Sequence, residues 1–541
     1  MVPDNSIADQ SHVVNTSSAA ACLPEKPEVE EDGLLGSDPN ERHFVTGHLL
    51  ANLKIRTISS GFVTMAAQGA QFLLNLGTIM ILARLLTPQD FGLVAMVTTV
   101  MGFLRTFGDA GLSTATVQRE GITHAQVSNL FWMNVAVGGL MSLIVAGFAP
   151  VIAWFYRDPR LVTITLALSI TFLMTGSAVQ HWALLTRQMR FKVMAAIQLS
   201  SMLAGTLAGV GMALLKCGYW SLVGSIVSMA VVRLTLVWVA SRWRPQFFTP
   251  RSGTRSLLSF GANLTVGTFI CSLARGSDNL LVGRFYGPDS IGLYSRASAL
   301  LTRPLEQFLN PIQAVFLPAF SRLQTQPERY RATFLQVYEA IALMGFFFTG
   351  LVLALAHPLT LVVLGQKWEK AAIIFAGFTF AALHYPLSGA STWLFYSQGR
   401  GRDWLLASLV ISFVTVASFI GGLPFGPAGV AIVYSASCLL INLPILYWIA
   451  GRRGPVTAKD LWMGFLCHLP VWGVIFGATY LTHNMVRNLA PFTELLICVP
   501  VGLLAGAAFV YVYAPSRRAA LSLLNALQEL LRSRRHLSSV K

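Results

Sequence analysis

Charged residues are scarce in this chain. Only 11% of its 541 residues are charged, whereas apolar residues make up 54%. Because an average soluble domain is about 25% charged, the chain has too little charge to cover a water-facing surface. This scarcity excludes a soluble globular protein and predicts an all-α polytopic membrane protein. The formal net charge of +16 requires no nucleic acid partner, since basic cytoplasmic loops produce the same excess.

Motifs for catalysis, metal binding and disulfide pairing are also missing. The six cysteines stand singly and the histidines have no ligand-spaced partners, so neither a disulfide framework nor a metal site is indicated. The sequence has no glycine-rich phosphate loop, no nucleophile elbow and no paired carboxylates of the glycosidase type. We therefore expect no metal, no cofactor and no catalytic residue, and a protein that is not an enzyme.

The apolar residues gather in about fourteen segments, each long enough to cross a bilayer core as a helix of about 20 residues. Connections between them are short, and no segment resembles a folded soluble domain. The predicted spans lie near residues 58–83, 91–115, 129–155, 161–185, 193–214, 219–240, 257–283, 290–318, 333–363, 371–397, 404–422, 427–449, 461–482 and 492–513.

The charge distribution predicts which side the loops face. The first 44 residues hold nine acidic and two basic residues without apolar periodicity, which favours a disordered acidic tail over residues 1–50. With this tail inside, the inner loops hold sixteen Lys and Arg and the outer loops eight, so both termini are predicted to be cytoplasmic. Residues 515–541 are predicted to form a basic amphipathic helix at the anionic inner leaflet, with an ordinary solvated tail as the alternative.

One short polar break occurs twice in the chain. Residues 82–93, LARLLTPQDFGL, return 200 positions later as VGRFYGPDSIGL at 282–293. WALLTRQMR at 182–190 similarly resembles WLFYSQGRG at 393–401. Together these echoes predict an internal duplication. Identical positions in the first pair include Arg84 and Arg284, Pro88 and Pro288, and Gly92 and Gly292.

Six predicted spans separate the two copies of the break, so both repeats run in the same direction. The sequence therefore predicts two parallel six-helix lobes, residues 51–250 and 251–455, related by a pseudo-two-fold axis along the membrane normal. Residues 456–514 add two further transmembrane helices. Two facing lobes enclose a central cleft, which is the arrangement that alternating-access transporters use.

Several charged residues lie inside the predicted spans, where each costs about 2.5–3.5 kcal/mol to insert. Arginine predominates, and a guanidinium stays charged and binds phosphate through a two-pronged donor fork. We expect a cationic lumen that binds an anion, such as the phosphate of a lipid-linked sugar, and that is formed by Arg105, Arg275, Arg296 and Arg303. The acids that we expect to couple an ion or to pair with these arginines are Asp109, Asp278 and Glu306.

A structural explanation of the same charges stays open. Arg105 with Asp109, and Arg275 with Asp278, are four and three residues apart, so each pair could neutralise itself on one helix face. Arg296 has no acid within one turn of its own helix, and pairing explains it less well.

Two other residues of the spans have a peripheral interpretation. Arg233 could extend its guanidinium to the membrane interface, and the alternative that it faces the lumen stays open. Trp182 lies near a predicted interface and is assigned to the aromatic belt.

Specific stretches of the chain resemble a known family. LARLLTPQDFGLVAM, GDAGLSTATVQRE, SDNLLVGRFYGPDSIGLYSRA and FLPAFSRLQ are similar to the bacterial polysaccharide exporter family, whose superfamily also contains multidrug antiporters and the lipid II flippase. The resemblance implies a V-shaped helical fold and flipping of an undecaprenyl-pyrophosphate-linked oligosaccharide across the inner membrane for exopolysaccharide, capsule or O-antigen. It also implies work alongside polymerase and chain-length or export proteins.

Two other functions remain as alternatives to a flippase. A drug or cation antiporter of the same superfamily should show unpaired acids in its lumen, whereas arginines outnumber acids here. A membrane-embedded polysaccharide polymerase would be an enzyme with a large outer loop bearing Arg or His, and the longest outer loop is only about eight residues. The flippase is therefore the leading hypothesis.

Overall fold

The computed structural model describes residues 53–105, 116–117, 122–247 and 255–521, without the side chains of 53–64, 255–271 and 308. These residues form helices and short turns, and no strand occurs among them. The first half contains α2 (Leu53–Leu85), α3 (Pro88–Arg105), α5 (His124–Tyr156), α6 (Arg160–Arg187), α7 (Phe191–Leu214) and α8 (Trp220–Ser241).

The second half begins with a much longer helical segment. Its elements are α9 (Arg255–Arg322), α10 (Pro327–Ala354), α11 (Ala356–Val363), η2 (Gln366–Trp368), α12 (Ala371–Gly377), α13 (Thr379–Ser397), α14 (Gly401–Gly422), η3 (Leu423–Phe425), α15 (Gly426–Ser437), the π-helix η4 (Cys438–Asn442) and α16 (Leu443–Gly451). The last three are α17 (Ala458–Leu466), α18 (Leu469–Val486) and α19 (Pro491–Val512).

The length and apolar composition of the helices make this a multi-pass membrane protein. Among the described residues nine helical segments can cross a bilayer, or ten if the bent pair α12–α13 is one span. Each of the fourteen predicted segments overlaps one or more helices, but 91–115 extends beyond the described residues and α14 to α16 count as one segment, Gly401–Gly451. The number of fourteen crossings therefore stays a prediction.

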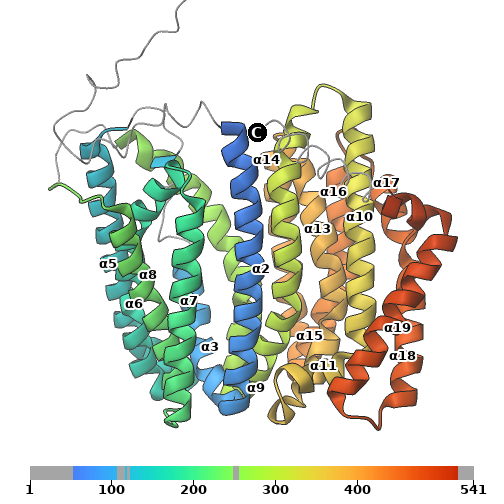
Figure 1. Ribbon diagram of the computed structural model, residues 1–541, viewed down its shortest axis with the longest axis horizontal. Helices are drawn as coiled ribbons and strands as arrows, with labels where there is room; N and C mark the ends of the chain where they lie inside the picture. The colour runs from blue at the N-terminus through green and yellow to red at the C-terminus, as the bar shows by residue number, and fades with distance from the viewer. Residues whose placement is uncertain (1–52, 106–115, 118–121, 248–254, 522–541) are drawn as a thin grey trace, which may run out of the picture.

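Figure 1 shows upright, roughly parallel helices, some in front of others, arranged in two groups along the longest axis of the molecule. Helices α5 to α8 pack against one another on one side, and α10 and α13 to α16 pack together on the other. The helices α3 and α9 join the two groups through an extensive contact, and α18 and α19 flank α10 at the far end. Of two large apolar clusters, one spans both groups around α3, the second part of α9 and α12, and the other lies around α10, α13 and α16.

The long helix α9 covers two predicted spans and is interrupted once. Gly287, in the second copy of the break, has φ 76° and ψ −175°, a conformation that is essentially restricted to glycine. In the first copy the equivalent residue is Thr87, whose hydroxyl accepts from the Asp90 amide at 3.3 Å and begins α3. The two copies therefore start their second helices by different local means.

The two copies of the break lie against each other. A Cβ atom added to Gly92 of α3 would overlap the backbone of Pro288, and one added to Gly292 of α9 would overlap the backbone of Pro88. The contact is reciprocal, because each glycine meets the proline of the other copy. Only residues without a side chain allow two helices to approach this closely.

A second pair of repeated loops has matching geometry. Arg190 is the residue before α7 with φ −82° and ψ 51°, and Arg400 is the residue before α14 with φ −85° and ψ 53°. The Arg190 guanidinium donates to the Ala240 carbonyl at 2.9 Å, and that of Arg400 donates to the Ala450 carbonyl at 2.7 Å. Each arginine thus binds the carbonyl end of a later helix, α8 for Arg190 and α16 for Arg400.

Some expectations fall on residues outside the described ranges. These are the acidic tail 1–50, most of the basic tail 515–541, and Asp109. The described part of the basic tail, up to Leu521, is helical.

Candidate anion-binding site

Arg296 of α9 extends into a cavity between helices of the other half. The cavity has a volume of about 250 Å³ and is lined from α2, α3, α7 and α8, and Arg296 is the one lining residue from α9 in the described chain. Its guanidinium lies 5.1 Å from the ring centroid of Phe91, and its Nε is buried without a hydrogen-bond partner. A guanidinium desolvated in this way is well placed to bind an anion.

The other arginines of α9 lie further from this cavity. Arg303 is exposed two turns after Arg296, and the two like charges act on each other. Arg275 is also exposed, and Tyr385 of α13 lies within the electrostatic reach of both Arg275 and Glu306. Within the described chain, no ion pair joins Arg275, Arg303 or Glu306 to an oppositely charged residue.

Asp278 is placed differently from the arginines. Its side chain is buried and accepts the backbone N–H of Asn279 at 2.6 Å. The neighbouring groups that act on it include Tyr294 and Tyr434. Among the residues with described side chains, none forms an ion pair with Asp278, so the predicted Arg275–Asp278 pair is not formed here.

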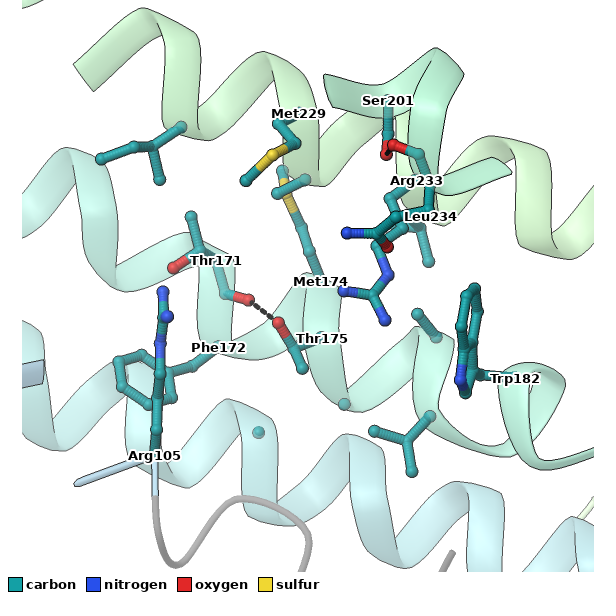
Figure 2. Close-up of a pocket in the computed structure, with 17 residues that line it drawn as sticks. Arg105, Thr171, Phe172, Met174, Thr175, Trp182, Ser201, Met229, Arg233 and Leu234 are labelled. Atoms are coloured by element: carbon teal, nitrogen blue, oxygen red, sulfur yellow. Dashed lines mark hydrogen bonds between the residues drawn. The ribbon is translucent and has the colours of Figure 1, made fainter. Parts of the chain in front are cut away.

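Arg105 belongs to a second and larger cavity within the first half. This cavity has a volume of about 380 Å³ and is enclosed by α3, α5, α6, α7 and α8. Figure 2 shows Arg105 and Arg233 extending into the same space from opposite sides, with Thr171 and Thr175 of α6 on its wall. The two cavities adjoin, because Ile226 and Met229 of α8 line both.

Two further residues that line this cavity are Arg233, for which the sequence left an interfacial and a lumen position open, and Trp182, which the sequence assigned to the aromatic belt. The Arg233 guanidinium lies 4.7 Å from the ring centroid of Trp182, and both side chains line the cavity (Figure 2). This placement favours the lumen position for Arg233, whereas the depth of Trp182 in the membrane stays a prediction. A sequence signal existed for Arg233, since it is a charged residue deep in a predicted span.

The expected cationic residues thus separate into three places. Arg296 occupies the smaller cavity, Arg105 shares the larger one with Arg233, and Arg275 and Arg303 lie on α9 outside both. No group of three or more His, Cys, Asp or Glu side chains that could hold a metal ion occurs in the described part of the chain.

The fold and these cavities define a multi-pass helical membrane protein with the fold of a known flippase. A solved structure titled lipid II flippase MurJ, inward closed conformation, matches with a TM-score of 0.67 over 84% of this chain and 99% of that chain. The two sequences are 14% identical, so the likeness concerns the fold.

The family follows from the sequence match. The chain belongs to the polysaccharide biosynthesis protein family, whose model matches residues 81–373. It is 27% identical to the succinoglycan biosynthesis transport protein ExoT of Rhizobium meliloti (strain 1021), over 74% of this chain and 81% of the relative. It is 24% identical to the lipopolysaccharide biosynthesis protein WzxC of Escherichia coli (strain K12), over 77% of this chain and 87% of the relative.

Proposed function

We propose that this protein is a flippase of the bacterial inner membrane. Its substrate is an undecaprenyl-pyrophosphate-linked oligosaccharide repeat unit used for exopolysaccharide, capsule or O-antigen. The family, the names of the relatives and the flippase fold support this proposal. The polysaccharide polymerase and the chain-length or export proteins that use such a product are the partners that follow from it.

The observation that supports the substrate most directly is Arg296. A charged side chain in a membrane span costs about 2.5–3.5 kcal/mol by insertion scales, and the buried Nε of Arg296 has no hydrogen-bond partner in the described chain to offset this. An anionic ligand offsets the cost, and a diphosphate fits the two-pronged guanidinium donor. Arg303, two turns along α9, adds a second cation on the path to the same cavity.

Alternating access explains why the two halves meet mainly where α3 crosses α9, with further contacts at the end of α2, where Trp368 donates to the Ala83 carbonyl. In our proposal, residues 51–250 and 251–455 form two lobes related by a pseudo-two-fold axis, and the crossing of α3 and α9 closes them on the outer side. The reciprocal contact of Gly92 with Pro288 and of Gly292 with Pro88 supports such an axis. Rocking of the lobes about this crossing exposes the arginines to either side of the membrane.

The sidedness of the proposal rests on the basic loops. The loops that follow α6, α8, α9, α13 and α16 hold most of the loop arginines and lie at the end where α2 begins. By the positive-inside rule this end is cytoplasmic, and both chain termini are then cytoplasmic. The crossing of α3 and α9 is at the opposite, outer end.

The acids of the same region are candidates for energy coupling. Asp278 is buried without an oppositely charged partner in the described chain, and Glu306 lies on the same helix as Arg303. We propose that Asp278 and Glu306 bind the coupling ion or balance the arginines, and Asp109 keeps the same proposed role.

The proposal is tested in a deletion strain that expresses single variants. We expect Arg296→Ala and Arg303→Ala to abolish surface polysaccharide while the protein still inserts at the normal level. Arg322→Ala is the matched control, because Arg322 is an exposed arginine at the end of the same helix. Normal export by both Arg296→Ala and Arg303→Ala would contradict the role of the arginines.

A further inference from the structure

We propose that the larger cavity, enclosed by α3, α5, α6, α7 and α8, is a separate binding site for an acidic sugar. Its ligand is a monosaccharide unit that bears a carboxylate or a phosphate. The inference rests on the proposed function, because the acidic sugar would belong to the glycan that is flipped. It differs from that function in placing glycan recognition inside the first half, away from the arginines of α9.

The charges of the cavity point to an anion. Arg105 and Arg233 both extend into it, and the described residues that line it include no Asp or Glu. Neither guanidinium has a hydrogen bond or an ion pair within the described chain, and the stacking of Arg233 on Trp182 leaves its charge uncompensated. Two unpaired cations facing one space are stabilised by the anionic group of a ligand that accepts from at least one of them.

The hydroxyl groups of the wall point to a sugar. Thr171 donates its hydroxyl to the Leu168 carbonyl at 2.6 Å, and Thr175 donates to the Thr171 carbonyl at 2.7 Å. Ser201 donates to the Gln198 carbonyl at 3.0 Å. Each hydroxyl has used its one hydrogen; Thr171 and Ser201 are buried, and the exposed Thr175 oxygen can accept from a ligand. A ligand that presents hydroxyl donors next to an anion matches this wall.

The size and position of the cavity agree with this ligand. A volume of about 380 Å³ is within the range of about 300–1,000 Å³ typical of small-molecule sites. The shared wall at Ile226 and Met229 of α8 places the cavity beside the one that Arg296 enters. A repeat unit whose diphosphate binds Arg296 can therefore place a neighbouring sugar against Arg105 and Arg233.

The test uses the purified full-length protein in detergent and three probes. D-glucuronate and glucose 6-phosphate present the two oxyanions, and glucose is the neutral reference. We expect wild type to bind at least one acidic probe at least ten times more tightly than glucose. The double variant Arg105→Gln/Arg233→Gln should lose this preference, whereas Arg322→Gln should keep it. The probe that binds more tightly identifies carboxylate or phosphate as the oxyanion.

Two further variants separate misfolding and failure of the proposed function from failure of this inference. If the double variant does not fold, Arg233→Lys replaces it in the test. Arg233→Lys keeps a cation near Trp182 and should weaken binding of the acidic probe about three-fold. Arg296→Gln should leave binding of D-glucuronate unchanged while it lowers binding of undecaprenyl pyrophosphate. Absence of a preference for both acidic probes in wild type overturns the inference, and so does full binding by Arg105→Gln/Arg233→Gln. If Arg296→Gln binds undecaprenyl pyrophosphate as tightly as wild type and the acidic probes behave as expected, the proposed diphosphate site fails and the sugar site stands.

Discussion

The two halves of the chain have loops of similar geometry but carry different charges in their helices. The loop before α7 and the loop before α14 share backbone geometry and the same arginine-to-carbonyl contact. By contrast, α2 has no charged residue between positions 57 and 83, whereas the matching part of α9 contains Arg275 and Asp278. Similar loops but different helix charges are expected when a segment is duplicated and one copy then gains a new role.

The correspondence can be followed residue by residue. If the ungapped match of the breaks continues into the flanking helices, Arg296 corresponds to Met96 and Arg303 to Phe103. Met96 and Phe103 are buried core residues of α3. The first half thus uses these positions for packing, and the second half uses them for charge. The difference locates the proposed diphosphate site on α9.

The largest predicted effect concerns the crossing that the two halves share. Gly92→Leu and Gly292→Leu should each destabilise the protein by more than about 3 kcal/mol and abolish export, because the new side chain meets backbone rather than a flexible side chain. Thermal unfolding of the purified protein and surface polysaccharide are the measurements. Gly77→Leu on α2 is the control, since nothing lies within 4 Å of an added Cβ there. If Gly92→Leu behaved like Gly77→Leu, the crossing would not be a close contact.

The next effect separates the two matching arginines. Arg400 is largely buried, and besides Ala450 it donates to the Ile449 carbonyl at 2.9 Å and pairs with Asp403 at 2.9 Å. Arg190 is exposed and donates to one carbonyl. We expect Arg400→Ala to cost about 2–3 kcal/mol and Arg190→Ala about 1 kcal/mol, measured by thermal unfolding in one detergent. Equal losses would mean that the two loops contribute alike.

A smaller effect compares the two helix starts after the breaks. Gly287→Ala forces a side chain into a conformation that only glycine tolerates, which costs about 1–3 kcal/mol. Thr87→Ala removes a helix cap and costs about 1 kcal/mol. The melting temperatures of the two variants should fall in that order. The reverse order would show that the capping residue matters more than the interruption of α9.

The smallest effect concerns the Asp158–Arg160 pair at the start of α6, whereas in the loop before α12 of the second half Glu369 pairs with His357 at 3.5 Å. In the loop before α6, Asp158 accepts from Arg160, and this hydrogen bond lowers the pKa of the Asp158 carboxyl. A lowered pKa stabilises the fold above the unfolded-state value of about 3.9, and the contribution is lost as the pH falls through the lower folded-state value. Because Arg160 is 41% exposed, Asp158→Asn should cost only about 0.5 kcal/mol at neutral pH. The difference from wild type should shrink below pH 4; a constant difference would exclude the ion pair as its cause.

Much of the fold was predictable from the sequence. Apolar length and loop composition predicted the helices, because a membrane span must satisfy its backbone internally and has few alternatives. The repeated break at 82–93 and 282–293 predicted a duplication. The contacts of Gly92 and Gly292 with the opposite copy were not predictable. A repeat indicates that two segments are similar, but it does not indicate that they are in contact.

The candidate site was only partly predictable. Deep arginines such as Arg296 are visible in sequence, since charge in a span is costly. The cavity that joins Arg105 of α3, Trp182 of α6 and Arg233 of α8 depends on how three distant segments pack. The absence of an Arg275–Asp278 pair depends on side-chain direction, which spacing along a helix does not determine.

The most direct test of the account is the leaflet on which the lipid-linked repeat unit accumulates in a strain expressing Arg296→Ala. Spheroplasts of this strain would be treated with a membrane-impermeant periodate reagent that oxidises exposed sugars, and the lipid-linked fraction would then be analysed. We predict that intact repeat units accumulate and are protected, because they remain on the inner leaflet. Oxidised, unpolymerised repeat units on the outer leaflet would contradict the account and indicate a step after flipping.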